Sequence, residues 1–129
     1  MILVDTSAWV EYLRGAGSPT SIRVRGYRDL TDELGITDVV VMELLASADS
    51  PGAEQRVEAI ADGLPLLPVE SVDYVEAAAL YRRCRLRGET VRKLDDCLIA
   101  AVAIRNDVPV LHNDRDFDVL ARHTALRVA

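Results

Sequence analysis

The segment between Leu94 and Asn106 constrains the fold most, because it has the length of a helix and is almost wholly apolar after its first turn. Its central run is Cys97-Leu98-Ile99-Ala100-Ala101-Val102-Ala103. A helix that is hydrophobic on every side is buried rather than exposed. The sequence therefore predicts a central helix that other elements of the chain enclose.

Short aliphatic runs alternate with helical segments along the rest of the chain. We expect strands over residues 2–4, 35–37, 66–67 and 110–111, with an edge strand over 126–128. We expect helices from Thr6 or Ser7 to Gly15 and over residues 19–34, 39–48, 51–63, 71–87, 94–106 and 116–122. This alternation predicts an α/β/α sandwich around a central, mainly parallel sheet. The 129 residues have the length of one domain, which we place over residues 1–129.

Two of these elements carry specific expectations about burial. The strand over 66–67 lies between two prolines and is expected to be buried. In the helix over 71–87, which we expect Ser71 to cap, the residues expected to face inward are Val72, Val75, Ala79 and Leu80.

Composition excludes several classes of protein. Half of the residues are hydrophobic, so the chain can bury a core and is not a disordered segment. No apolar run approaches the roughly 18–20 residues that a membrane span needs. The first residues lack the basic region of a secretory signal and meet Asp5 at once, so we expect a cytoplasmic protein. Cys84 and Cys97 lack zinc-site spacing and histidine companions, so we expect two buried free thiols.

The charge balance is acidic, although the cations are clustered. Fifteen basic and twenty-one acidic residues give a net charge of −6, whereas proteins that bind nucleic acid are usually basic. Fourteen of the fifteen cations are Arg, whose planar group binds phosphate bidentately. We therefore expect a carboxylate cluster beside a basic groove, while a solvated helix face explains any single Arg cluster equally well.

Four acidic residues stand in apolar surroundings, which carboxylates rarely occupy unless they are paired or ligated. They are Asp5, Glu43, Asp96 and Asp114. In an open parallel sheet, ligands bind beyond the carboxyl ends of the strands. Asp5 and Asp114 follow strands, Asp96 can face the same crevice from the start of a helix, and Glu43 has to project into it from another helix.

Carboxylates that converge repel one another, and some of them protonate unless a cation lies among them. Mg²⁺ and Mn²⁺ prefer oxygen ligands. One ion, or two about 4 Å apart, can activate a water and stabilise the leaving oxygen in phosphodiester hydrolysis. Each acid also has a structural interpretation, as a helix cap (Asp5), an exposed helix residue (Glu43), a first-turn residue (Asp96) or a turn residue (Asp114 and Asp116).

Four blocks of the sequence resemble, in order, the PIN-domain family, and specifically the VapC toxins of bacterial and archaeal toxin–antitoxin pairs. The blocks are Ile2-Leu3-Val4-Asp5-Thr6-Ser7-Ala8-Trp9, Met42-Glu43-Leu44, Asp96-Cys97-Leu98-Ile99-Ala100-Ala101 and Leu111-His112-Asn113-Asp114-Arg115-Asp116-Phe117. The third block matches a D-x-x-I-A-A pattern and the fourth a D-x-D-F pattern. The resemblance covers essentially the whole chain.

The resemblance implies an endoribonuclease that depends on Mg²⁺ or Mn²⁺, with Asp5, Glu43, Asp96 and Asp114 as catalytic residues around the metal. Asp116 matches an acid that contributes to the metal site in some members. Relatives cut RNA, often tRNA or ribosomal RNA, and a cognate VapB-type antitoxin silences them. They commonly form homodimers, which we expect here. The choice between one metal ion and two stays open.

Contacts with RNA and with the antitoxin can be placed on particular residues. Arg85, Arg87, Arg92 and Lys93 precede Asp96 and are the candidate RNA contacts, because cations near the metal can bind phosphates. The antitoxin is expected to lay an apolar helix in a groove near Trp9 and Tyr12. It is also expected to bring an Arg to the carboxylates.

Three other functions remain in competition. A phosphatase of the haloacid-dehalogenase type also begins with a strand ending in Asp, but it needs a second Asp where this chain has Ser7. DNA-directed, flap-cutting relatives are generally much longer. A catalytically inactive PIN-like binding module would share the same four blocks, and loss of RNA cleavage on Asp5→Asn would distinguish an enzyme from it.

Overall fold

The computed structural model describes residues 1–15, 17–29 and 33–129. Its elements, in chain order, are β1 (Ile2–Val4), α1 (Thr6–Arg14), α2 (Pro19–Asp29), β2 (Leu34–Gly35), α3 (Asp38–Ser47), α4 (Pro51–Asp62), α5 (Ser71–Leu86), α6 (Leu94–Arg105), β3 (Val110–Leu111) and α7 (Arg115–His123). Within the described residues, no helix combines the length and the apolar character that crossing a membrane requires.

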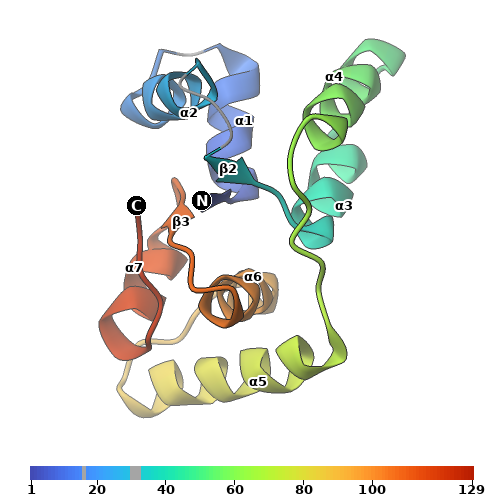
Figure 1. Cartoon of the computed structure of the whole chain (residues 1–129). Helices are drawn as coiled ribbons and strands as arrows, with labels where there is room; N and C mark the ends of the chain where they lie inside the picture. The colour runs from blue at the N-terminus through green and yellow to red at the C-terminus, as the bar shows by residue number, and fades with distance from the viewer. Residues whose placement is uncertain (16, 30–32) are drawn as a thin grey trace.

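A parallel sheet with the strand order β2-β1-β3 lies at the centre of the described structure. Leu3 of the middle strand pairs with Gly35 on one side and with Val110 on the other. All three residues of β1 are buried, as expected for a strand in a parallel sheet with both faces covered. Figure 1 shows α1 and α2 on one side of the sheet and α5 and α6 on the other. The predicted α/β sandwich is confirmed.

Helix α6 is the central helix that its apolar sequence predicts. Its residues from Asp96 to Ala103 are all buried. The helix packs against α5 and α7, and Figure 1 shows it between the sheet and α5. Cys97 in this helix and Cys84 in α5 are buried free thiols, as expected. The start of α6, and with it Asp96, is therefore fixed by the core.

Two predicted strands are reduced to single bridges, and one predicted helix is shorter than expected. Leu66 makes a single bridge, to Ile36, because the prolines on either side of 66–67 cannot donate to a ladder. Its side chain is half exposed, so the expectation that this segment is buried is wrong. Val128 likewise makes one bridge, to Val110. Helix α2 ends at Asp29 rather than at residue 34, since Leu34 belongs to β2; residues 30–32 lie outside the described part of the chain.

The inward face of α5 also differs from the prediction. Val72 and Val75 are exposed, and the buried residues of this helix are Asp73, Ala77, Leu80 and Cys84. Asp73 is turned inward because Arg105 of α6 binds both of its carboxylate oxygens. Glu70, rather than Ser71, caps the helix, and its backbone N–H donates to Asp73.

Candidate active site

The carboxyl edge of the sheet carries a pocket of about 290 Å³. β1 leads directly into Asp5, and the segment after β3 provides Asn113. Helix α3 contributes Glu43, and the start of α6 contributes Asp96. Three of the four predicted acids therefore meet around one cavity, as the ends of parallel strands predict.

Asp5 is held rigidly on one side and has no hydrogen-bond partner on the other. It caps α1, and its Oδ2 accepts hydrogen bonds from the Ser7 backbone N–H (2.9 Å) and hydroxyl (2.6 Å). The same hydroxyl accepts from the Asn113 backbone N–H at 2.8 Å, which links the ends of β1 and β3. Oδ1 of Asp5 is buried and has no partner among the described residues. Burial raises the pKa of Asp5 despite the hydrogen bonds from Ser7.

Glu43 projects from α3 into the pocket. The hypothesis of a shared acidic site needed this orientation, which the sequence alone could not establish. Its Oε1 accepts a hydrogen bond of 2.9 Å from the Thr6 hydroxyl. The residue is half-buried. Burial raises the pKa of Glu43, and the negative charges of Asp5 and Asp95 add to that effect. The carboxylate is thus oriented by α1 and remains open to solvent.

Asp96, Asp114 and Asp116 form a second grouping that overlaps the pocket at Asp96. One carboxylate oxygen of each lies within 4.8 Å of the others. Asp96 is only 2% exposed, and its Oδ2 has no hydrogen-bond partner among the described residues. Burial, the contact with Asp116 and the charge of Asp5 raise the pKa of Asp96 to about 9. The neutral form of this carboxyl is favoured unless a cation joins it.

Two cations neutralise the outer part of this cluster. Arg92 Nη2 donates to Asp114 Oδ1 at 2.9 Å, and Lys93 Nζ lies 2.9 Å from Asp114 Oδ2. Although burial opposes the shift, Lys93 and the backbone N–H of Asp116 hold the pKa of Asp114 below its usual range. The carboxylates of Asp114, Asp96 and Asp5 raise the pKa of Lys93 in turn. The ionised form is therefore favoured at Asp114, whereas the neutral form is favoured at Asp96.

Asp116 fastens the segment before α6 to α7. The side chain is completely buried, and its Oδ1 accepts from the Arg92 backbone N–H and Nε, both at 3.2 Å. Its Oδ2 accepts from the Lys93 backbone N–H at 3.1 Å. Both oxygens thus have donors, and the residue supports the cluster from behind.

The predicted RNA contacts divide into two groups. Arg92 and Lys93 lie at the acidic cluster, and their side chains are 56% and 54% exposed. Arg85, at the end of α5, lies over the ring of Tyr81 at 5.7 Å from its centroid. In the described part of the chain, neither Arg85 nor Arg87 lines the pocket.

The donor set fits a hard divalent cation. Asp5 Oδ1 and Asp96 Oδ2 are buried carboxylate oxygens without a hydrogen-bond donor in the described structure. Mg²⁺ and Mn²⁺ take such oxygens as ligands. His112 is directed elsewhere: its Nδ1 accepts from the Asp114 backbone N–H at 3.1 Å, and its ring packs on Phe117. The candidate metal ligands of the pocket are therefore carboxylate oxygens.

The sequence did not reveal the supporting roles of Thr6, Ser7 and Asn113. Thr6 or Ser7 was one candidate cap of α1 and Asp5 was another. The cap is Asp5, and the two hydroxyls orient Glu43 and Asp5. Their position directly after a strand-ending acid was the available signal. Asn113 and its partner Ser7 are 106 positions apart in the sequence, so no local pattern predicts their contact.

The groove near the N-terminal helices differs from the prediction. Trp9 is fully buried and cannot line a docking surface. A groove of about 390 Å³ lies instead between α1, α3 and α4 and is lined in part by Val10, Leu13, Leu44 and Val57. Val10 also lines the acidic pocket, so the groove and the pocket adjoin at this residue.

Comparison with known proteins decides the family. The family model described as "PIN domain" matches residues 2–123. The Mycobacterium tuberculosis protein named Ribonuclease VapC11 is 45% identical over 133 aligned positions, which cover 100% of this chain and 98% of that protein. The chain belongs to the VapC family of PIN-domain proteins.

Solved structures show the same fold as this PIN domain. VapBC2 from Rickettsia felis, crystallised with a DNA fragment from its promoter, gives a TM-score of 0.76 at 16% identity, covering 100% of this chain and 98% of that one. VapBC-5 from Mycobacterium tuberculosis, a member of the VapBC family of toxin–antitoxin systems, gives 0.66 at 25% identity, covering 98% and 95%. The VapC-family sandwich is thus recovered over nearly the full length of each chain.

Proposed function

We propose that this chain is a metal-dependent endoribonuclease toxin of a VapBC-type toxin–antitoxin pair. It would hydrolyse phosphodiester bonds in RNA such as tRNA or ribosomal RNA. The observation that carries the proposal is the pair of buried, unpartnered oxygens on Asp5 and Asp96, which share a pocket with Glu43. The 45% identity to a protein named a ribonuclease supports the same conclusion.

The proposed ligands of Mg²⁺ or Mn²⁺ are Asp5, Asp96, Asp114 and Glu43, with Asp116 contributing from behind. They supply oxygen atoms only, and the cluster of Asp96, Asp114 and Asp116 lies within a metal's reach. When bound, such an ion supplies Lewis-acid stabilisation of the charge that develops on the phosphodiester group.

The side chains of the pocket would divide the remaining work. Glu43 is half-buried, so solvent can reach its carboxylate, and its raised pKa makes it a better base than an ordinary glutamate. We propose that Glu43 accepts a proton from the attacking water, while the hydrogen bond from Thr6 fixes the orientation of the carboxylate. Ser7 holds Asp5 in place, so its role is to position rather than to react.

The RNA backbone is proposed to approach along Arg92 and Lys93. Their half-exposed side chains stand at the edge of the pocket and carry positive charge. Arg85 and Arg87 would extend this track towards the end of α5. Phosphate contacts of this kind make binding strongly dependent on salt.

The proposed antitoxin lies in the groove between α1, α3 and α4. An amphipathic helix can place its apolar side chains against Val10 and Leu13. Because Val10 also lines the acidic pocket, the same segment can bring an Arg to the carboxylates. The net charge of −6 attracts a basic segment to this chain.

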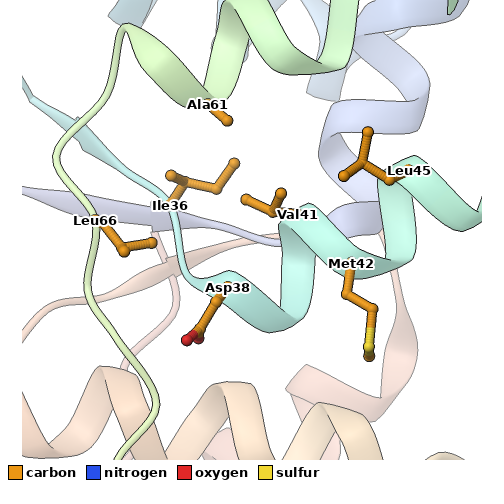
Figure 2. A pocket seen from close by; sticks show the side chains of 7 residues that line it. All are labelled: Ile36, Asp38, Val41, Met42, Leu45, Ala61 and Leu66. Carbon is orange, nitrogen blue, oxygen red and sulfur yellow. The ribbon is translucent and has the colours of Figure 1, made fainter. Parts of the chain in front are cut away.

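A second copy of the chain is proposed to cover an apolar pocket on α3. Figure 2 shows this pocket, whose volume is about 560 Å³ and whose lining includes Val41, Met42, Leu45 and Leu66. Met42 is 58% exposed and Leu66 is 53% exposed. Large apolar side chains gathered in one hollow mark an interaction surface. Light scattering on Met42→Glu, beside the unaltered chain, tests the homodimer: loss of the dimer supports this surface.

The proposed activity is tested with purified protein and total RNA, with and without Mn²⁺, followed by mapping of the cleaved ends. We expect defined cuts by the unaltered chain with Mn²⁺, and none by Asp5→Asn or in the presence of a chelator. Expression of the unaltered chain alone should halt growth, and the adjacent small open reading frame should restore it. RNA that is bound but left uncut would favour the inactive binding module.

A further inference from the structure

The acidic cluster holds the only lysine of the chain. All fourteen other cationic side chains are Arg. Lys93 Nζ lies 2.9 Å from Asp114 Oδ2 and 3.7 Å from Asp96 Oδ2. Lys93 also lines the same pocket as Asp5. Its ammonium group therefore stands among the carboxylates that we assign to the metal ion.

The neighbouring Arg92 occupies a different position. It binds the outer carboxylates, with Nη2 at 2.9 Å from Asp114 Oδ1 and Nε at 3.2 Å from Asp116 Oδ1. Arg92 is not part of the pocket lining in the described structure. An ammonium is a compact point charge, whereas a guanidinium is a planar fork. The cation that faces the unpartnered oxygen of Asp96 is thus the one that most resembles a small ion.

We propose that Lys93 is an internal competitor of the divalent ion: its ammonium neutralises the metal-free carboxylates and is displaced when the ion binds. This inference rests on the proposed function, because it assumes that the ion binds at Asp96 and Asp114. Both cations require the same carboxylate oxygens, and they repel each other at contact distance.

Displacement of the ammonium needs no movement of the backbone. The Lys93 side chain is 54% exposed and has a flexible four-carbon stem. The Lys93 backbone N–H stays bound to Asp116 Oδ2, at 3.1 Å. The ammonium can therefore leave Asp96 and Asp114 while the loop keeps its place. After displacement its charge is free at the edge of the pocket.

The consequence is a metal affinity that Lys93 lowers and a metal-free state that Lys93 stabilises. Removal of the charge should strengthen metal binding by roughly 1.5- to fivefold, the range that corresponds to a partly exposed ion pair. The same substitution should lower the unfolding temperature of the metal-free protein. That difference should shrink when metal is saturating, because the ion then supplies the missing positive charge.

The test is calorimetric titration of Mn²⁺ into the full chain and three variants, at about pH 8 to limit competition by protons. Lys93→Gln removes the charge, and Lys93→Arg keeps it. Arg25→Gln removes one charge from the exposed side of α2 and serves as the matched control. We expect tighter binding only in Lys93→Gln, an affinity for Lys93→Arg closer to that of the unaltered chain, and no change in Arg25→Gln.

A measurement on the unaltered chain keeps the proposal testable if Lys93→Gln folds poorly. Labelling with ¹³C-lysine gives a single side-chain Cε signal, because the chain has one lysine. That signal should move as Mg²⁺ is added, with a midpoint that matches the binding curve. A stationary signal, or unchanged or weaker Mn²⁺ binding by Lys93→Gln, overturns the competitor role. Absence of any metal binding by the unaltered chain would instead overturn the proposed function.

Discussion

Asp73 and Asp96 are equally buried, each 2% exposed, but their surroundings are opposite. Arg105 donates to both oxygens of Asp73 at 2.9 Å, and the Glu70 backbone N–H donates at 2.8 Å. Although burial opposes the shift, these donors hold the pKa of Asp73 below its usual range. Asp96 faces other carboxylates and has one oxygen without a donor in the described structure, and its pKa is raised to about 9.

The comparison shows that burial of a carboxylate does not by itself mark a functional site. The pair of Asp73 and Arg105 is complete, so it links α5 to the end of α6 and serves the fold. Asp96 is incomplete, because nearby Lys93 is at 3.7 Å, too distant for a hydrogen bond. An incomplete buried carboxylate destabilises the protein until a cation arrives.

The largest expected difference between the two aspartates is in catalysis. Asp96→Asn should lower the rate of RNA cleavage at saturating Mn²⁺ by at least about 100-fold, because loss of a metal ligand removes several kcal/mol of transition-state stabilisation. Asp73→Asn should leave the rate per folded molecule unchanged. The measurement is a cleavage time course corrected for the folded fraction. Equal losses of cleavage rate in both variants would contradict the assignment of Asp73 as a structural acid and Asp96 as a functional one.

The next effect concerns stability and should be larger at Asp73 than at Asp96. Arg105→Met leaves the Asp73 carboxylate buried without its partner and should cost about 3 kcal/mol of unfolding free energy. Lys93→Met should cost less than about 1 kcal/mol, because the Lys93 side chain is more than half exposed. Urea unfolding of the metal-free proteins measures both. A larger loss from Lys93→Met than from Arg105→Met would contradict this ordering.

The smallest expected effect is on the pH dependence of stability. Asp73 has a lowered folded pKa, so its contribution is present above its ordinary value of 3.8 and disappears as the pH falls. Asp96 has a raised folded pKa, so its contribution is present below 3.8 and disappears as the pH rises towards about 9. The metal-free protein should therefore lose on the order of 1 kcal/mol of unfolding free energy per pH unit between roughly pH 6 and pH 9. Asp96→Asn should abolish that alkaline loss, and an identical loss in the variant would refute it.

Local patterns predicted the parts of the fold that local chemistry determines. The aliphatic run Ile2–Val4 became the middle strand, and the apolar run after Asp96 became the buried helix. The inward turn of Asp73 was missed, because it depends on Arg105, which is 32 positions away in another helix. A hydrophobic pattern cannot reveal that a carboxylate replaces valine on the buried face of α5.

The candidate site was predictable to a similar depth. The order of the acids and their positions at strand ends predicted that they converge, and Asp5, Glu43 and Asp96 do line one pocket. Their roles as catalytic residues and metal ligands stay predictions. From the sequence, Lys93 was predicted to lie near the site as an RNA contact. Its ion pair with Asp114 joins residues 21 positions apart, so no local pattern could predict it.

Thermal unfolding of the unaltered chain and of Asp96→Asn, each with and without Mn²⁺, tests the central claim most directly. Without metal, Asp96→Asn should be the more stable protein, because one of the repelling carboxyl groups is gone. With saturating Mn²⁺, the unaltered chain should gain stability by mass action and the variant should not, so that the order reverses. An equal rise in the unfolding temperature of both proteins would contradict the assignment of the ion to Asp96.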